Sequence, residues 1–104
     1  MERKISDKDC PVRKSMQIFA GKWTLLIIFQ LNQRTIRYGE LKRAIPNISE
    51  KMLTDELKFL CNKGLVKKEQ YPEVPPRVEY SLTELGEKVL PIIDEIAKFG
   101  MENL

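Results

Sequence analysis

The chain has 104 residues, of which 42% are hydrophobic and 32% are charged, so it is long enough for one globular domain with one modest core. Its net charge is +3, but residues 1–68 hold 15 Lys and Arg against 7 Asp and Glu, whereas residues 69–104 hold 3 against 8. Histidine is absent and the five glycines are scattered, which removes the commonest general base, the commonest metal ligand and any phosphate-binding loop, so we expect no enzyme, no cofactor and no metal site.

Two helices are predicted in the first third of the chain. Met1–Asp9 is polar and predicts only a frayed segment. Pro11 suits the first turn of a helix, which makes Cys10 its N-cap residue. Apolar residues then recur with a period near 3.6: Val12, Met16 and Phe19. Gly21 interrupts the chain before residues 22–31, which are apolar nearly all round and predict a buried central helix, with a β-strand as the competing interpretation.

Residues 35–64 predict a helix-turn-helix. Thr35–Arg37 is a short strand candidate, and Tyr38–Ile45 predicts a short helix with three inward-facing residues, Tyr38, Leu41 and Ile45. Pro46 marks a turn, because the residue before a proline avoids the helical region. A second helix follows over residues 49–63. Two short helices joined by about three residues, the second polar on its outer face, form this motif.

We call residues 49–63 the reader helix. Ser49 caps its start, with Asn47 and Glu50 as a rival capping pair, and Gly64 ends it because glycine adopts a left-handed C-cap at little steric cost. One face is apolar: Leu53, Leu57, Leu60 and Cys61. The opposite face is mostly polar and offers groups that reach phosphates or base edges: Ser49, Lys51, Met52, Thr54, Asp55 and Lys58. A solvated helix face is the alternative interpretation.

After Gly64 the pattern changes to strands. Residues 65–71 and 77–82 partly alternate apolar and polar side chains, with Val78, Tyr80 and Leu82 on one side. Three of the five residues between them are prolines, which predicts a stiff, exposed hairpin tip rather than a central strand. A hairpin directly after a helix-turn-helix makes a winged helix, with residues 65–82 as the wing. A generic β-hairpin is the alternative.

Residues 83–104 predict a last helix, capped by Thr83 and with Glu84 in its first turn. Its apolar residues spread over more than half of its circumference. One small core does not cover so wide an arc, so we expect part of this helix to meet a second copy of the chain. Pro91 removes a backbone donor and should kink the helix near residues 87–90. Two short helices folded back on their own domain are the alternative.

From Cys10 to Gly100 the chain closely resembles the HxlR-type transcriptional regulators, a branch of the MarR-like winged-helix proteins. The matching segments are Cys10-Pro11-Val12, Gly21-Lys22-Trp23-Thr24, Arg37-Tyr38-Gly39-Glu40-Leu41, Ile48-Ser49 with Met52-Leu53-Thr54, Gly64-Leu65-Val66, and the long block from Pro75 to Gly86. The resemblance implies a single winged helix-turn-helix domain over residues 1–104, mainly α with a small antiparallel β wing (α+β). It also implies a cytoplasmic homodimer, joined through its terminal helices, that binds a pseudo-palindromic DNA operator.

The chain departs from the family at three positions. Phe99 stands where the family usually has Trp, which is a mild change. Lys68 stands where Arg is frequent, and it offers charge without a bidentate fork, so a specific phosphate clamp is less expected there. Cys61 replaces a frequent Glu, and we expect it to be a core residue beside Leu57 and Leu60.

Eight residues are candidates for DNA contact. In the fold that the resemblance implies, the reader helix lies in the major groove. Lys51, Met52, Thr54 and Asp55 are then nearest to base edges, Lys58 is nearer to the backbone, and Ser49 offers donors to a phosphate. Arg37, at the end of the first strand, and Arg77, at the base of the wing, are further phosphate or minor-groove candidates. For any one of them, solvation is the alternative.

Cys10 is a candidate redox or electrophile sensor, because the positive end of a helix dipole and the nearby Lys8, Arg13 and Lys14 favour thiol reactivity while Asp9 opposes it. Some members of the family that the chain resembles use the matching cysteine in this way and others do not. A small N-cap residue without a redox role is the alternative.

Other functions and locations have less support. A protein-binding adaptor without DNA affinity would need an apolar outer face on the reader helix, where only Met52 is apolar. RNA binding would need an aromatic stacking platform. The longest apolar run, Leu25–Phe29, is far shorter than the roughly 20 residues of a membrane span, no secretory signal is visible, and two cysteines suggest reduced thiols, so a cytoplasmic location is expected. The inducer, and the choice between repressor and activator, are not indicated.

Overall fold

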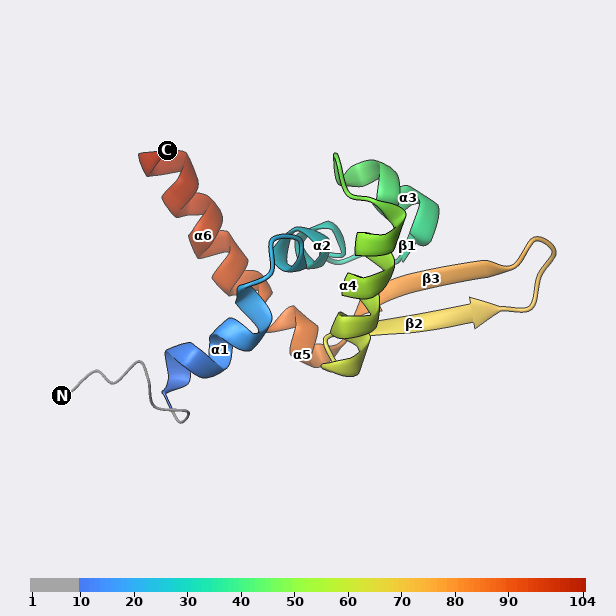
Figure 1. Cartoon of the computed structure of the whole chain (residues 1–104), viewed down its shortest axis with the longest axis horizontal. Coiled ribbons are helices and arrows are strands. Elements are labelled where there is room, and N and C mark those ends of the chain that lie inside the picture. The colour runs from blue at the N-terminus through green and yellow to red at the C-terminus, as the bar shows by residue number, and fades with distance from the viewer. Residues whose placement is uncertain (1–9) are drawn as a thin grey trace.

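The computed structural model describes residues 10–104, so the expected frayed start at Met1–Asp9 lies outside the described residues. The elements in chain order are α1 (Pro11–Phe19), α2 (Thr24–Gln30), β1 (Ile36–Arg37), α3 (Tyr38–Ala44), α4 (Glu50–Asn62), β2 (Val66–Tyr71), β3 (Arg77–Leu82), α5 (Glu84–Glu87) and α6 (Leu90–Asn103). Figure 1 shows α3 and α4 beside the sheet, the β2–β3 hairpin reaching away from them, and α1 and α6 toward the opposite end. The predicted winged helix-turn-helix, mainly α with a small antiparallel sheet, is confirmed.

The helix-turn-helix forms where the sequence predicts it. α3 ends at Ala44, before Pro46, and Asn47 turns the chain with a positive φ of 70°. Ser49, rather than Asn47, caps α4: its hydroxyl oxygen accepts a hydrogen bond from the Met52 N–H at 3.1 Å. Gly64, with φ 76°, ends the helix in the left-handed region that favours glycine.

The core lies between α2, α3, α4 and the sheet. Its fully buried residues come from separate elements and include Ile27, Ile28, Leu41, Leu53 and Leu60. The predicted central helix within residues 22–31 is confirmed, with Thr24, Ile27 and Ile28 buried, but it is not buried on every side. α2 is shorter, Thr24–Gln30, and Leu26 and Phe29 remain 47% and 49% exposed, because no element among residues 10–104 covers that side.

The three-stranded antiparallel sheet has the order β1-β3-β2. Val66 pairs with Leu82 and Tyr71 with Arg77, so the wing keeps one register along its whole length. Tyr80 is buried and Val78 and Leu82 are half-buried, which confirms the predicted inward side of β3. The proline-rich segment joins the two strands as an exposed tip.

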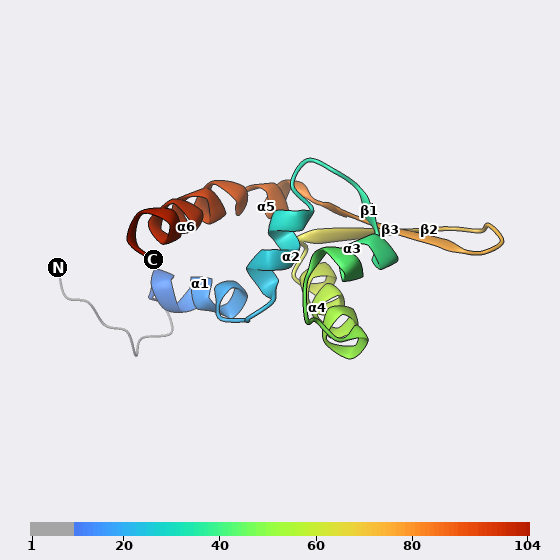
Figure 2. The ribbon, with the colours of Figure 1, turned by 90° about the horizontal axis from the view of Figure 1, so that it is seen from above.

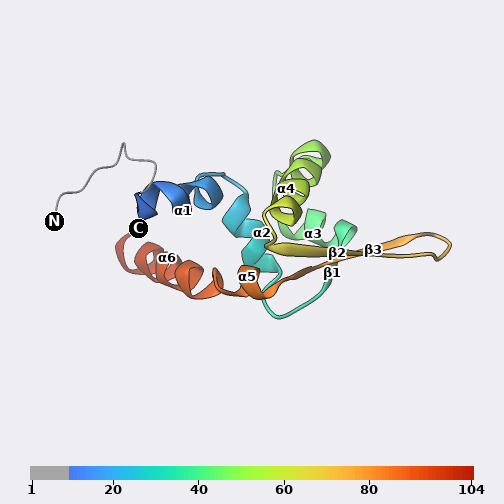
Figure 3. The ribbon, with the colours of Figure 1, turned by 90° about the horizontal axis from the view of Figure 1, so that it is seen from below.

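The last segment is two helices rather than one kinked helix. α5 ends at Glu87 and α6 starts at Leu90, with Pro91 in the first turn of α6, where its missing N–H costs no hydrogen bond. α6 is not folded back onto its own domain for most of its length: Val89 and Ile93 pack on the core, while Ile96 and Phe99 stay exposed. Figures 2 and 3 show α1 and α6 both at the end of the molecule opposite the wing.

Candidate nucleic-acid interface

The start of the reader helix is held by local hydrogen bonds. Because the Ser49 hydroxyl oxygen accepts from the Met52 N–H, its own hydrogen remains available to an external acceptor. Glu50 sits in the first turn, where the helix dipole favours a carboxylate. Met52 is 43% exposed on the same face. The first turn therefore presents one hydroxyl donor and one apolar side chain outward.

Lys51 and Asp55 form an ion pair on the exposed face of α4. The Lys51 ammonium and the Asp55 carboxylate are 2.8 Å apart, and the two side chains are 83% and 58% exposed. Their mutual hydrogen bond, with the attraction of opposite charges, raises the pKa of Lys51 and lowers the pKa of Asp55. An exposed pair of this kind is weak and opens easily, so both groups can be redirected toward a polar ligand.

Thr54 occupies the side of the helix that faces α3. Its hydroxyl lies 3.2 Å from the Tyr38 hydroxyl, which donates to the Glu50 carbonyl oxygen at 3.2 Å. The Thr54 hydroxyl thus serves as the donor between these two side chains, and Thr54 is half-buried. Lys58, one turn further along, is exposed. Of the predicted contact residues on α4, Thr54 is the one with an internal hydrogen-bond partner on another element.

The two arginines outside α4 differ in environment. Arg37 is exposed at the N-cap of α3, where its backbone N–H donates to the Glu40 carboxylate at 3.4 Å. Arg77 lies over the Tyr71 ring, 4.1 Å from its centroid, and is 27% exposed. Two carboxylates neutralise the Arg77 guanidinium, Glu73 at 3.4 Å and Glu79 at 3.5 Å. The guanidinium of Arg77 is therefore already compensated by the wing.

Two contacts that sequence reasoning missed hold the reader helix in place. The buried Thr24 hydroxyl donates to the Glu56 carboxylate at 3.0 Å, which joins α2 to the middle of α4. The Thr83 hydroxyl donates to the Gly64 carbonyl oxygen at 2.6 Å, which joins the end of α4 to the start of α5. The partners in each contact are far apart in the sequence, so no local pattern indicates these contacts. The only sequence feature that points to one of them is the segment Gly21-Lys22-Trp23-Thr24, which contains Thr24.

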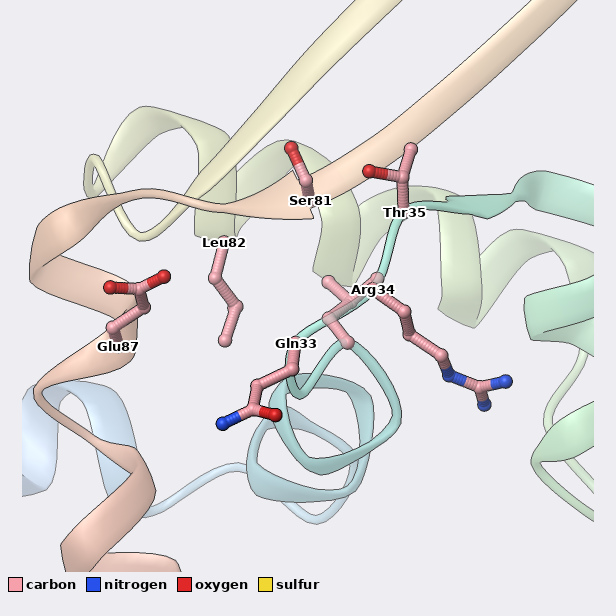
Figure 4. Close-up of a pocket in the computed structure, with 7 residues that line it drawn as sticks. Gln33, Arg34, Thr35, Ser81, Leu82 and Glu87 are labelled. Atoms are coloured by element: carbon pink, nitrogen blue, oxygen red, sulfur yellow. The ribbon is translucent and has the colours of Figure 1, made fainter.

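A shallow hollow of about 290 Å³ lies on another part of the surface, between the α2–β1 turn, the end of β3 and α5. Figure 4 shows Glu87 on one side and the Arg34 side chain extending away from it. The Arg34 guanidinium is already engaged with Gln30, through the carbonyl oxygen at 2.9 Å and the side-chain oxygen at 3.0 Å. The residues that line this hollow therefore offer no paired acid and base.

Both cysteines are free thiols. Cys10 is half-buried at the N-cap of α1, as predicted, but its side chain makes no capping hydrogen bond. Cys61 is half-buried against the core cluster rather than fully inside it, and burial raises the pKa of its thiol while the nearby Lys68 opposes that shift. No helix among residues 10–104 is long and apolar enough to cross a membrane.

Known proteins share this sequence and fold. The model of the HxlR-like helix-turn-helix family matches residues 18–104. An HTH-type transcriptional regulator from Methanothermobacter thermautotrophicus is 44% identical over 91 residues, which are 88% of this chain and 70% of that protein. A crystal structure described as a MarR-family transcriptional regulator from Porphyromonas gingivalis W83 is 89% identical, covers 98% of this chain and 100% of its own, and has a TM-score of 0.94. The redox regulator HypR in its oxidized form is 37% identical with a TM-score of 0.85, over 91% of this chain and 98% of its own.

Proposed function

Because the chain belongs to the HxlR-like helix-turn-helix family and is a transcriptional regulator, we propose that it binds a pseudo-palindromic DNA operator as a homodimer in the cytoplasm. The observation that carries this proposal is the exposed polar face of α4, next to a wing and at the opposite side of the molecule from an uncovered apolar surface. One surface is suited to a duplex and the other to a second copy.

The reader helix enters the major groove with its first turns toward the bases. Lys51, Met52 and Asp55 are the outermost side chains and read base edges, and the Ser49 hydroxyl donates to a phosphate. Lys58 and Arg37 contact phosphates on either side of the groove. Thr54 contacts the DNA together with Tyr38, whose hydroxyl is already hydrogen-bonded to the Thr54 hydroxyl. Arg77 contributes less charge than Lys58, since Glu73 and Glu79 compensate it.

The homodimer forms through the apolar surface opposite the wing. Large apolar side chains there are 42% to 86% exposed: Val12, Met16, Leu26, Phe29, Ile92, Ile96, Phe99 and Met101. On α6, Ile92, Ile96 and Phe99 recur at helical spacing, on a side different from the buried Ile93. A monomer that keeps so much apolar surface in water is better stabilised by pairing. Two reader helices about 34–36 Å apart would then enter successive major grooves.

The test measures how affinity for selected genomic DNA depends on salt. If about six phosphates are neutralised per dimer, log affinity falls with log salt at a slope near −5. Lys58→Gln removes one phosphate-contacting cation per subunit, so we expect the slope to become shallower by about 2 per dimer. The matched control is Lys98→Gln on α6, which removes the same charge far from the reader helix and should leave the slope unchanged.

The ion pair adds a second arm. Lys51→Gln leaves the Asp55 carboxylate facing the DNA without its cation, so Lys51→Gln with Asp55→Asn should bind more tightly than Lys51→Gln alone. An equal slope for Lys58→Gln, Lys98→Gln and the parent protein would contradict the groove placement. A protein-binding adaptor is the remaining alternative, and it predicts no retention on DNA at any salt concentration.

Cys10 gives the regulator a thiol that responds to oxidants or electrophiles. Its position at the start of α1 and the similarity to the redox regulator HypR support this role. DNA binding by the parent protein should fall after treatment with diamide and recover with dithiothreitol. Cys10→Ser should abolish the response, whereas Cys61→Ser should keep it. If DNA binding by Cys10→Ser still falls after diamide treatment, a residue other than Cys10 causes the response.

A further inference from the structure

A second hollow, of about 260 Å³, lies between the reader helix and the base of the wing. Its floor is largely apolar. Leu57 and the Tyr80 ring are 3% and 7% exposed, and the half-buried Cys61 thiol lies beside them. Thr54 and Asn62 add polar atoms at the edge. Because ligand sites in proteins usually measure about 300–1,000 Å³, a hollow of this size suits a small ligand.

The hollow has a cationic rim. Lys58 comes from α4 and Lys68 from β2, so each of these two elements contributes one lysine to the lining of the hollow. No carboxylate is among the seven residues that line it. This leaves two positive charges beside an apolar floor.

The nearest acids on the same two elements are already engaged. The Asp55 carboxylate pairs with Lys51 at 2.8 Å. The Glu69 carboxylate pairs with Lys67 at 3.3 Å and accepts from the Tyr71 hydroxyl at 2.9 Å. The Asp55 carboxylate also attracts the Lys58 ammonium, but it is shared with Lys51 and does not line the hollow, so the positive charge at the rim is only partly offset and an external anion would balance the rest.

We propose that this hollow binds a small organic anion, a carboxylate or phosphate monoester on a compact apolar body. Its apolar body rests on Leu57, Cys61 and Tyr80, and its anionic group lies between Lys58 and Lys68. An inorganic ion would leave the floor uncovered, and an uncharged molecule would leave the two ammonium groups unpaired. The apolar floor and the two lysines therefore favour a ligand that has both an apolar body and an anionic group.

The site also bears on regulation, and this step rests on the proposed function. Lys58 faces a backbone phosphate in the proposed complex. An anion held between Lys58 and Lys68 neutralises the same charge and fills the space between the reader helix and the wing. Occupancy therefore weakens DNA binding, and the ligand acts as a releasing effector.

Calorimetry without DNA tests the site itself. The probes are phenylacetate and phenyl phosphate, with 2-phenylethanol as the uncharged analogue and inorganic phosphate as the bare anion. We expect dissociation constants of about 0.1–5 mM for the two organic anions, given their small size, and at least about tenfold weaker binding of the other two. Equal binding of 2-phenylethanol or of inorganic phosphate would overturn the proposal, as would no binding by either organic anion.

Three single-charge variants locate the binding. Lys58→Gln and Lys68→Gln should each weaken phenylacetate binding about tenfold. Lys63→Gln is the matched control on the same helix, since Lys63 lies over the Phe59 ring and does not line the hollow. A Lys63→Gln effect equal to the other two would mean that net charge alone attracts the probe, which contradicts a defined site.

The Cys61 thiol gives an independent readout. The chain has two cysteines, so in Cys10→Ser the only thiol left is Cys61, inside the hollow. Phenylacetate should slow its alkylation by iodoacetamide with the same concentration dependence as the calorimetry, while 2-phenylethanol at equal concentration should not. Alkylation that ignores saturating phenylacetate would place the bound probe elsewhere.

Failure of the regulatory step is distinguishable from failure of the proposed function. The ratio of DNA affinities with and without saturating phenylacetate is measured within each variant. We expect at least about a fivefold loss in the parent protein and none in Lys68→Gln. If phenylacetate binds but DNA affinity does not change, the proposed binding site stands and the proposed effector role is contradicted. No DNA affinity under any condition would remove the proposed function instead.

Discussion

At the scale of single residues, the most informative hydrogen bond joins Thr24 to Glu56. Thr24 is 1% exposed, and its hydroxyl is the contact between the scaffold helix α2 and the middle of the reader helix. Thr24→Val keeps the shape and leaves the Glu56 carboxylate without that donor, so we expect a loss of about 1–2 kcal/mol in the free energy of unfolding. Urea unfolding followed by the fluorescence of Trp23, the single tryptophan, measures it.

A double-mutant cycle separates this hydrogen bond from packing effects. In the Glu56→Ala background, Thr24→Val should cost about 1 kcal/mol less than it does in the parent protein, because the acceptor is already gone. Strictly additive losses would mean that the two side chains are neighbours without an energetic coupling.

Alkaline stability is set by two protonated groups in or beside the core. Burial raises the pKa of Tyr80 above its ordinary value of 10.0 and the pKa of Cys61 above its ordinary value of 9.0. The unfolded chain therefore releases these protons first as the pH rises. The stabilisation is complete below about pH 9 and declines above it as the pH passes from the ordinary values toward the raised ones. Urea midpoints between pH 7 and 10.5 should show this decline.

Tyr80→Phe is the matched variant for that pH profile. It removes the titrating hydroxyl and keeps the ring, so its urea midpoint should fall less steeply above pH 10 than that of the parent protein. The same slope in both proteins would assign the alkaline decline to other groups, such as the lysines.

At the scale of elements, the end of the reader helix is fixed directly onto the start of α5. The Thr83 N–H donates to the Leu65 carbonyl oxygen at 3.1 Å, and the Thr83 hydroxyl accepts from the Gly86 N–H at 3.1 Å. Gly86 approaches the backbone so closely that an added Cβ would collide with the Leu65 carbonyl oxygen. This contact sets the direction in which the terminal helices leave the DNA-binding half.

Two glycines in the terminal helices allow a matched comparison. Gly86→Ala should lower the free energy of unfolding by about 2–3 kcal/mol, because the new methyl group meets backbone that cannot move aside. Gly100→Ala, with no atom within 4 Å of its added Cβ, should raise it by about 0.5–1 kcal/mol through helix propensity. Both are measured by urea unfolding. Similar effects of the same sign would contradict the rigid contact at Gly86.

The elements themselves were largely predictable, because their signals are local. Ser49, Gly64 and the proline-rich tip each specify a boundary by their own backbone chemistry, and each prediction is confirmed. The break at Lys88–Val89 was predicted as a kink, with two short helices as the alternative, since a proline fits equally well inside a bent helix or at the start of a new one. Tertiary packing decides between these two outcomes.

The candidate site was less predictable than the elements. Helical spacing placed Lys51 and Lys58 on the outer face correctly. It did not indicate that Arg77 is enclosed by two wing carboxylates, that Thr54 bonds to Tyr38, or that Lys58 and Lys68 line the same hollow. The ion pairs of Arg77 depend on the geometry of the β2–β3 hairpin. The other two depend on how α3 and β2 are placed against α4, and residue spacing within one element carries no information about that placement.

At the scale of the whole molecule, the wide apolar arc of the terminal segment has a simple explanation in the structure. One side of α6, with Ile93, packs on the core of its own chain, and another side, with Ile92, Ile96 and Phe99, is uncovered. Other large apolar side chains are exposed on α1 and α2: Val12, Met16, Leu26 and Phe29. Burial in the monomer explains the apolar residues Ile27 and Ile28 of the predicted buried helix, but it does not explain Leu26 and Phe29.

Pairing of two chains through this surface is the condition for the proposed DNA binding, and Phe99→Glu tests it. Phe99 is 61% exposed in the single chain, so glutamate there should not disturb the fold. In a symmetric pair it would bury two uncompensated carboxylates, which should weaken dimerisation by about 4 kcal/mol, or about a thousandfold. Sedimentation velocity should then show monomers, with an unchanged circular dichroism spectrum. DNA affinity should fall about a hundredfold or more, since each monomer holds only one half-site.

Val74→Glu, at the fully exposed wing tip, makes the same kind of substitution away from this surface and should remain dimeric. A Phe99→Glu protein that stays dimeric would place the interface elsewhere, and a monomeric one that binds the operator at full strength would separate DNA binding from pairing.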